Sequence, residues 1–205
     1  METKELAFVH RYVEGKSDQT LLLLHGTGGN EEDLLSIGEA VGGERNLLSP
    51  RGKVLEHGMP RFFRRLAEGV FDEEDVRRRA AELAEFVREA STAYGFDAGK
   101  VTALGYSNGA NIAGAVMLLR PEVLAGAVLL RPMVPLVPAV LPKLAGKRVL
   151  ISSGRFDPMG NAQETRRLRE MFENAGAAVT MAEQAAGHNL VQEDFAQAKR
   201  WLETT

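Results

Sequence analysis

The sequence predicts an α/β fold with a mostly parallel central sheet flanked by helices. Three observations lead to this prediction. Short, continuous apolar runs of strand length occur along the whole chain. Between them lie longer segments in which apolar residues recur every three or four positions, as expected of helices that cover a sheet. At 101–119, an apolar run leads through a glycine-flanked serine directly into a helix rich in small residues.

Seven segments are predicted as strands. Residues 20–24 form an unbroken apolar run, which is typical of a central strand buried on both faces. Residues 6–13 alternate only loosely and indicate an edge strand, and the short strand 46–49 ends at the turn-forming Pro-Arg-Gly of 50–52. The remaining strands are expected at 101–106, 125–130, 148–152 and 178–183.

Helices are expected between these strands. The clearest covers residues 72–94, with Asp72 as its N-cap and Gly95 as its stop. Its apolar stripe consists of Val76, Ala80, Leu83, Val87 and Ala90. Further helices are expected at 110–119, 165–175 and 191–202, and the arginine runs at 77–79 and 166–167 are interpreted as their solvated faces.

Size and composition indicate a single domain over residues 1–205, because this length suffices for one substantial core. A net charge of −3 leaves no basic footprint for nucleic acid, and no apolar run reaches the length of a membrane span. Cysteine is absent and the start of the chain lacks a signal-peptide core, so we expect a cytoplasmic protein. The four histidines are scattered, so neither metal nor cofactor is expected, while a homodimer is left open.

The glycine-flanked serine is Ser107, in the sequence Gly-Tyr-Ser-Asn-Gly of 105–109. Such a strand–turn–helix junction is typical of a nucleophile elbow, in which a strained backbone raises the serine hydroxyl above the sheet. We expect glycine at 105 and 109 because a Cβ at either position would collide across the tight turn.

A serine hydroxyl needs a histidine base and an orienting carboxylate to act as a nucleophile at neutral pH. The sequence has one histidine after Ser107, namely His188, which follows the last predicted strand. Asp157 follows the strand 148–152 and is the predicted acid. The rival acids are expected to face solvent from helices or to lie off the relevant loop; they are Glu122, Glu164, Glu170, Glu173, Glu183, Glu193, Asp194 and Glu203.

Two backbone amides are predicted to hold a developing oxyanion, those of Asn108 and Thr27. Thr27 belongs to the glycine-rich loop at 25–29, which lacks both the Lys-Ser/Thr ending of a P-loop and the spacing of a dinucleotide fingerprint. His25, at the start of this loop, is interpreted as a brace that forms hydrogen bonds rather than as a base.

With Leu-His-Gly-Thr-Gly-Gly-Asn at 24–30, the elbow at 105–109, Asp157 and His188 in place, the chain resembles the phospholipase/carboxylesterase family. This resemblance implies an α/β-hydrolase fold in its minimal form, without a cap domain. Three further segments resemble the small bacterial carboxylesterase branch, which is related to the acyl-protein thioesterases; they are 47–52, 58–63 and 130–135.

Two features differ from the thioesterase branch. That branch typically has glutamine after the nucleophile, where this chain has Asn108, and its oxyanion loop is usually Gly-x-Gly-Asp, unlike the Gly-Thr-Gly-Gly-Asn of 26–30. The family resemblance therefore indicates a carboxylesterase acting on small to medium esters through Ser107, His188 and Asp157 and an acyl-enzyme. The alternatives are a thioesterase or lysophospholipase acting on longer acyl chains, and a non-catalytic ligand-binding protein of this fold.

The resemblance also implies that residues 58–71 cross near the active site and that 131–135 form part of its rim. Four apolar residues in these segments suit a pocket wall or ordinary core packing; they are Phe62, Phe63, Phe71 and Met133. The arginines at 61, 64 and 65 suit either an acidic substrate or a solvated basic segment, and the solvated segment is favoured.

Overall fold

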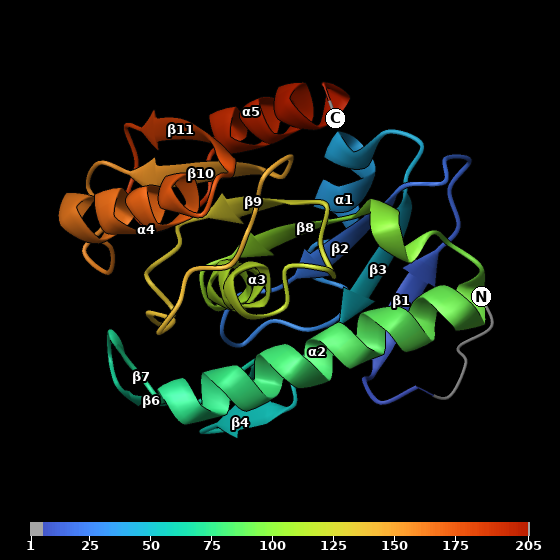
Figure 1. Ribbon diagram of the computed structural model, residues 1–205, viewed down its shortest axis with the longest axis horizontal. Coiled ribbons are helices and arrows are strands. Elements are labelled where there is room, and N and C mark those ends of the chain that lie inside the picture. Colours follow the sequence, from blue (N-terminus) through green and yellow to red (C-terminus); the bar gives the residue numbers. More distant parts are fainter. Residues whose placement is uncertain (1–5, 205) are drawn as a thin grey trace.

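The computed structural model describes residues 6–204 (Figure 1). Its centre is a seven-stranded sheet in the order β1-β3-β2-β8-β9-β10-β11, in which β1 is antiparallel to β3 and every other pair is parallel. This confirms the predicted α/β class. The strands are β1 (His10–Val13), β2 (Thr20–Leu24), β3 (Asn46–Pro50), β8 (Val101–Tyr106), β9 (Gly126–Leu130), β10 (Arg148–Gly154) and β11 (Ala178–Gln184).

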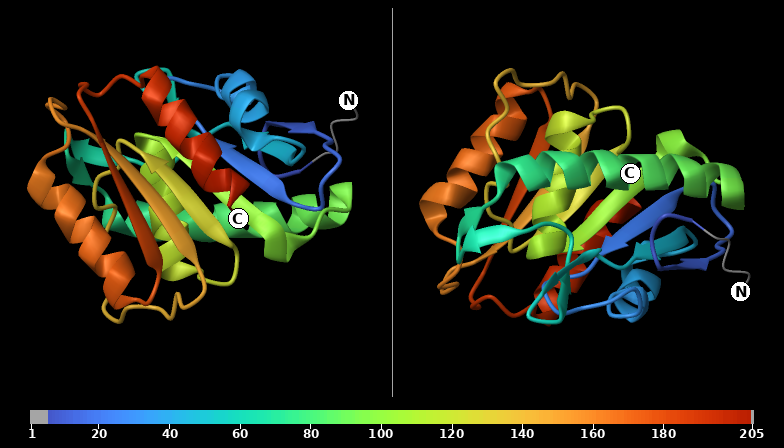
Figure 2. Two further views of the ribbon diagram at one scale, coloured as in Figure 1. Left: turned by 90° about the horizontal axis from the view of Figure 1, so that it is seen from above. Right: turned by 90° about the horizontal axis from the view of Figure 1, so that it is seen from below.

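Helices cover both faces of the sheet, as Figure 2 shows from two sides. On one face lie α2 (Glu73–Tyr94), α3 (Asn108–Leu119) and α4 (Ala162–Asn174). On the other lie α1 (Leu35–Gly42) and α5 (Gln192–Glu203). Consecutive leucines of β2 pack into the two cores in turn, Leu22 and Leu24 into the first and Leu21 and Leu23 into the second, because strand side chains alternate between faces.

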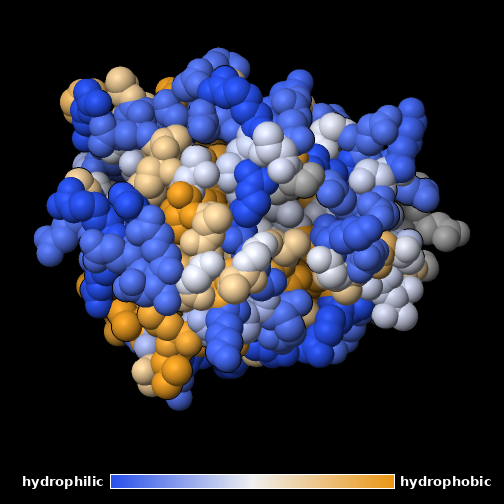
Figure 3. Space-filling model, turned by 45° about the horizontal axis from the view of Figure 1, so that its top comes forward, coloured by the Kyte–Doolittle hydropathy of each residue, from blue (hydrophilic) through white to orange (hydrophobic). Residues whose placement is uncertain are grey.

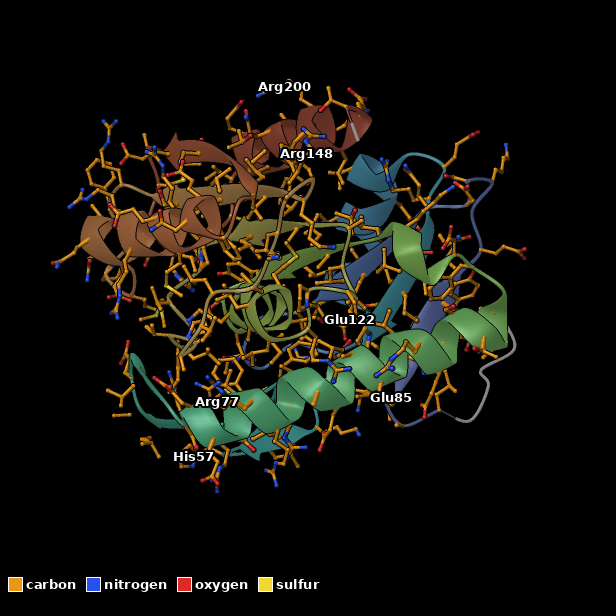
Figure 4. All side chains as sticks on the ribbon, viewed as in Figure 1. His57, Arg77, Glu85, Glu122, Arg148 and Arg200 are labelled. Atoms are coloured by element: carbon orange, nitrogen blue, oxygen red, sulfur yellow. The ribbon has the colours of Figure 1, made fainter. Side chains whose placement is uncertain are left out.

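The long helix α2 begins and ends as the sequence predicts. The Asp72 side chain accepts a hydrogen bond from the amide of Asp75 at 3.1 Å, and Gly95 takes a left-handed conformation with its N–H on the carbonyl of Ser91. Arg77, labelled in Figure 4, is 44% exposed on this helix and pairs with Glu73. At this position, the arginine run at 77–79 faces solvent as predicted. A short 3₁₀ turn, η1 (Ala98–Lys100), then leads into β8.

The helix α1 was not predicted from the sequence, because its eight residues include two glycines, which disfavour helix. The structure supplies a reason for these glycines. A Cβ on Gly38 would come within 2.7 Å of the Leu23 side chain, and one on Gly42 would contact Leu21 at 3.4 Å. Small residues at both positions allow α1 to lie close to β2.

Two small hairpins occupy the segment between β3 and α2. The first consists of β4 (Val54–Glu56) and β5 (Met59–Arg61), and the second of β6 (Arg65–Ala67) and β7 (Val70–Phe71). The sequence gives no secondary structure for this segment, whose strands have only two or three residues each. Figure 1 shows β6 and β7 at the end of the molecule toward which the parallel strands point. No helix within residues 6–204 is long and apolar enough to cross a membrane.

Candidate active site

Ser107 lies in the sharp turn between β8 and α3. Its φ of 52° and ψ of −114° are strained for a residue with a side chain, and such conformations cost about 1–3 kcal/mol. The turn is held by two backbone hydrogen bonds, from the Ser107 amide to the carbonyl of Leu130 and from the Asn111 amide to the carbonyl of Ser107, both 2.9 Å. Ser107 is thus the first residue after strand β8.

Both elbow glycines are required sterically, for different reasons. A Cβ on Gly105 would overlap the backbone of Gly109, which is the predicted collision across the turn. A Cβ on Gly109 would instead overlap the carbonyl of Leu24 and approach the His25 carbonyl oxygen at 2.6 Å. The prediction for Gly109 was therefore wrong in its partner, because α3 begins against the end of the neighbouring strand β2.

A chain of hydrogen bonds joins Ser107 to two distant loops. His188, in the loop between β11 and α5, has Nε2 at 2.9 Å from Ser107 Oγ and Nδ1 at 2.8 Å from Asp157 Oδ2. Asp157 lies between β10 and α4, and its side chain is only 5% exposed. Because the carboxylate can only accept, Nδ1 carries the proton, which leaves Nε2 free to accept the serine proton.

Arg131 anchors the loop that carries His188. Its guanidinium forms two 2.8 Å hydrogen bonds with Asp194, and both side chains are fully buried. The same guanidinium donates to the carbonyls of Gly187 at 3.0 Å and Asn189 at 3.2 Å, the two neighbours of His188. We call this arrangement the Arg131–Asp194 clamp.

The clamp corrects one sequence expectation. Asp194 was expected to face solvent from a helix, but it is wholly buried in the first turn of α5. Besides Arg131, its carboxylate accepts hydrogen bonds from the Ser152 hydroxyl at 2.6 Å and from the Val191 amide at 2.8 Å. Four donors satisfy the charge, which explains how it is tolerated in the core.

A small cavity of about 30 Å³ opens beside Ser107. Its lining combines arginine, amide and apolar side chains with the Ser107 hydroxyl and the His188 ring; the residues are Thr27, Arg61, Arg65, Gly69, Phe71, Ser107, Asn108, Asn111, Arg131, Met133, Met159 and His188. Most of the surface that Figure 3 shows is hydrophilic, with apolar side chains gathered at its lower left, where Figure 1 places β6 and β7.

With this geometry in view, comparison with known proteins identifies the family. The family model described as Phospholipase/Carboxylesterase matches residues 8–205. The chain belongs to the phospholipase/carboxylesterase family. It is 48% identical over 192 residues to the putative hydrolase MhqD of Bacillus subtilis, covering 94% of this chain and 96% of that protein.

Solved structures of this family are similar along the whole chain. The carboxylesterase of Bacillus cereus is 49% identical, with a TM-score of 0.93 over 95% of this chain and 92% of that one. The carboxylesterase of Mesorhizobium loti is 31% identical, with a TM-score of 0.91 over 99% and 98%. The resemblance and the fold class that the sequence indicates are confirmed, and the chain is a hydrolase of the carboxylesterase type.

Thr27 and Asn108, whose backbone amides are predicted to hold the oxyanion, both line the cavity. Among the described residues, neither the Thr27 amide nor the Asn108 amide has a hydrogen-bond acceptor. Their side chains hold neighbouring segments: Thr27 Oγ1 accepts from Arg61 Nη1 at 2.8 Å, and Asn108 Oδ1 accepts from the Phe62 amide at 2.7 Å.

The four apolar residues considered for the pocket wall divide into two pairs. Phe71 and Met133 line the cavity. Phe62 and Phe63 are 3% and 0% exposed and belong to the main core, which is the second of the two roles considered for them. The physical reason is that both rings pack against other rings. The Phe62 and His25 ring centroids are 4.7 Å apart, and Phe63 packs edge-on against Phe71 with 5.1 Å between the ring centroids.

His25 acts as a brace in the structure. Its Nε2 accepts from the Gly52 amide at 3.0 Å, so Nδ1 carries the proton that it donates to the Gly26 carbonyl at 2.6 Å. Burial lowers the pKa of this imidazole, which favours the neutral form that the hydrogen bond from the Gly52 amide needs.

The arginine segment 61–65 is only partly solvated, contrary to the favoured interpretation. The Arg64 side chain is 62% exposed and pairs with Asp72. Arg61, in contrast, is only 3% exposed, and Arg65 is 25% exposed. The hairpin fold explains the difference, because β5 turns Arg61 inward against the Thr27 loop.

Proposed function

We propose that this chain is a serine carboxylesterase that hydrolyses small to medium carboxylic esters through an acyl-enzyme. The observation that carries the proposal is the chain of hydrogen bonds from Ser107 through His188 to the buried carboxylate of Asp157. A nucleophile, a base with a free acceptor nitrogen and an orienting carboxylate are the components that serine acyl transfer requires.

In this mechanism, Ser107 Oγ attacks the ester carbonyl while His188 Nε2 takes the hydroxyl proton. The carbonyl oxygen becomes an oxyanion, held by the amides of Thr27 and Asn108. When the tetrahedral intermediate collapses, the C–O bond to the alcohol breaks and His188 gives the proton to the leaving oxygen. Water, deprotonated by His188, then attacks the acyl-serine, which releases the carboxylic acid and restores the Ser107 hydroxyl.

The cavity favours short acyl groups. Its volume of about 30 Å³ is far below the about 300–1,000 Å³ of pockets that enclose drug-sized ligands. The second candidate, a thioesterase or lysophospholipase acting on longer chains, is favoured by the exposed apolar residues Leu66 (72%) and Val70 (52%) of the β6–β7 hairpin. Values of kcat/KM on acetyl, octanoyl and palmitoyl esters and thioesters distinguish these two candidate functions.

The first test of the proposal is turnover of 4-nitrophenyl acetate together with labelling by a fluorophosphonate probe. Ser107→Ala should abolish labelling and lower kcat by at least about 10⁴-fold, since the nucleophile is lost. Asp157→Asn should lower kcat by about 10⁴-fold, because an amide favours the wrong imidazole tautomer. Ser36→Ala, on the exposed side of α1, is the matched control and should react like the wild type. Wild-type protein that neither labels nor hydrolyses esters contradicts the proposal.

A further inference from the structure

The charged side chains that line the cavity are all arginines. Three arginines, Arg61, Arg65 and Arg131, line it together with His188, and no carboxylate within residues 6–204 belongs to its lining. The acids that balance these residues contribute none of the cavity's surface. They are Glu56, Asp157 and Asp194, and each forms hydrogen bonds or ion pairs with one or two of the basic groups.

The charges around the cavity do not pair one to one. The charge of Arg131 is matched by the bidentate pair with Asp194, while the Asp157 carboxylate lies behind the neutral His188 ring and outside the lining. Arg61 and Arg65, however, share a single carboxylate. The Glu56 carboxylate accepts hydrogen bonds from Arg65 at 2.6–3.2 Å, and one of its oxygens lies 3.4 Å from Arg61 Nε. The pKa of Glu56 is lowered, chiefly by the hydrogen bonds from Arg65. Two cations and one anion leave one positive charge on this wall.

Arg61 is held in place rather than free to turn away. Its side chain is 3% exposed, and it donates through Nη1 to Thr27 Oγ1 at 2.8 Å and through Nε to the Phe63 carbonyl at 3.2 Å. Its guanidinium therefore has a fixed position between the oxyanion loop and the cavity. A fixed, poorly solvated cation interacts more strongly with an anion than an exposed one does, because little ordering is needed and screening is weak.

From this wall we infer that the preferred substrates are esters that carry a carboxylate a few bonds from the scissile carbonyl, recognised by Arg61 and Arg65. This inference rests on the proposed function. Asn111, whose Oδ1 accepts from the Met133 amide, also lines the cavity and adds an amide group to the polar wall. The apolar side chains of Phe71, Met133 and Met159 complete the lining and suit the short carbon chain between ester and carboxylate.

The experiment compares pairs of esters of the same shape by pH-stat titration. Monomethyl succinate against methyl 4-methylpentanoate places the carboxylate on the acyl side, and acetoxyacetate against isobutyl acetate places it on the alcohol side. For each pair, the ratio of kcat/KM for the anionic ester to that for the neutral ester is the selectivity. We expect wild-type selectivity of about 10-fold or more for one pair, because charge-assisted hydrogen bonds discriminate at this level.

Two variants test the assigned arginines. Arg65→Gln should lower the selectivity about 10-fold, and Arg61→Gln should lower it in the same direction. The ratio is used because Arg61 also holds the Thr27 loop, so its loss affects both esters of a pair alike. Arg64→Gln, which removes an exposed arginine of the same segment, is the matched control and should leave the selectivity unchanged.

Further readouts distinguish charge from shape. Glu56→Gln, which removes the shared counter-ion, should raise the selectivity. Raising the salt concentration from about 0.01 M to about 1 M should lower the part of the selectivity that the partly exposed Arg65 contributes. Hydrolysis of both neutral esters without a preference for either anionic ester overturns this inference and leaves the proposed function intact. So does selectivity that persists in both Arg65→Gln and Arg61→Gln. Absence of all ester hydrolysis overturns the proposed function and, with it, this inference.

Discussion

At the scale of single residues, backbone strain gathers where the central strands end. Ser107 follows β8 with a φ of 52°, and Arg131 follows β9 with a φ of 55°. Each turn is held by the next strand of the sheet: the Ser107 amide donates to the Leu130 carbonyl of β9, and the Arg131 amide donates to the Ser152 carbonyl of β10 at 2.8 Å. Ser107 and Arg131 are therefore fixed by the same three neighbouring strands, β8, β9 and β10.

His25 leads to a prediction about pH and stability. Because burial lowers its pKa in the folded state, the unfolded chain binds more protons than the folded chain once the pH falls below about 6.5. The free energy of unfolding should therefore decrease below that pH, by up to about 1.4 kcal/mol per pH unit from this group. Urea unfolding of wild type and His25→Gln at about pH 7.5 and about pH 5.5 measures the contribution.

The variant should lose less stability between the two pH values than the wild type does. His57→Gln, at the exposed turn of the β4–β5 hairpin, serves as the control and should behave like the wild type. Equal losses in wild type and His25→Gln would show that the neutral imidazole of His25 does not contribute.

At the scale of elements, the loop between β11 and α5 depends on contacts from other strands. The Arg131–Asp194 clamp joins the end of β9 to the first turn of α5, and the Ser152 hydroxyl adds a contact from β10. Tyr106, at the end of β8, donates from its hydroxyl to the His188 carbonyl at 3.2 Å. Three strand ends thus hold a loop that has no regular structure of its own.

The clamp should matter for turnover as well as for stability. Arg131→Met or Asp194→Asn alone should cost about 3–5 kcal/mol of unfolding free energy, because each leaves a buried charge without its partner. The double variant Arg131→Met/Asp194→Leu should regain most of that stability, since apolar residues tolerate burial. Its kcat on a neutral ester should stay about 10²-fold low, because Gly187 and Asn189 lose the donor that positions His188.

Urea unfolding and steady-state kinetics on the same samples check this prediction, with kcat separated from KM. Arg155→Gln, which breaks the exposed pair with Glu183, is the control and should change the unfolding free energy by less than about 1 kcal/mol. Recovery of both stability and kcat in the double variant would mean that the clamp is structural only and does not position His188.

At the scale of the whole molecule, the sheet separates two cores of unequal size. The larger lies under α2, α3 and α4, and the smaller lies under α1 and α5. Leu168 of α4 and Leu202 of α5 are fully buried on opposite faces. Because α5 packs on the smaller core and carries Asp194, this core also helps to hold the loop of His188.

Both cores should therefore contribute to one cooperative unfolding transition. Leu168→Ala and Leu202→Ala should each lower the unfolding free energy by about 2–5 kcal/mol, through lost apolar burial and the cavity that remains. Val140→Ala, at a residue 82% exposed, is the control and should change it by less than about 0.5 kcal/mol. Urea unfolding followed by circular dichroism and by Trp201 fluorescence should give coincident transitions. A negligible effect of Leu202→Ala would show that α5 unfolds separately from the rest.

By itself, the sequence determined the class of the fold, the seven strands of the central sheet and the two loops that bear Asp157 and His188. These features depend on neighbours along the chain: apolar runs, helical periodicity, caps such as Asp72, and the steric need for glycine at 105. Each can be recognised within a short window, because local sterics and periodicity produce it.

Only the tertiary structure decided which side chains of the irregular segments are buried. It placed Asp194 in the core opposite Arg131, 63 positions away, and turned Arg61 inward against Thr27, 34 positions away. It also sent Phe62 and Phe63 into the core while Phe71 reached the cavity. A residue outside regular helix or strand has no periodicity that assigns it a face, so its burial depends on which distant segment packs over it.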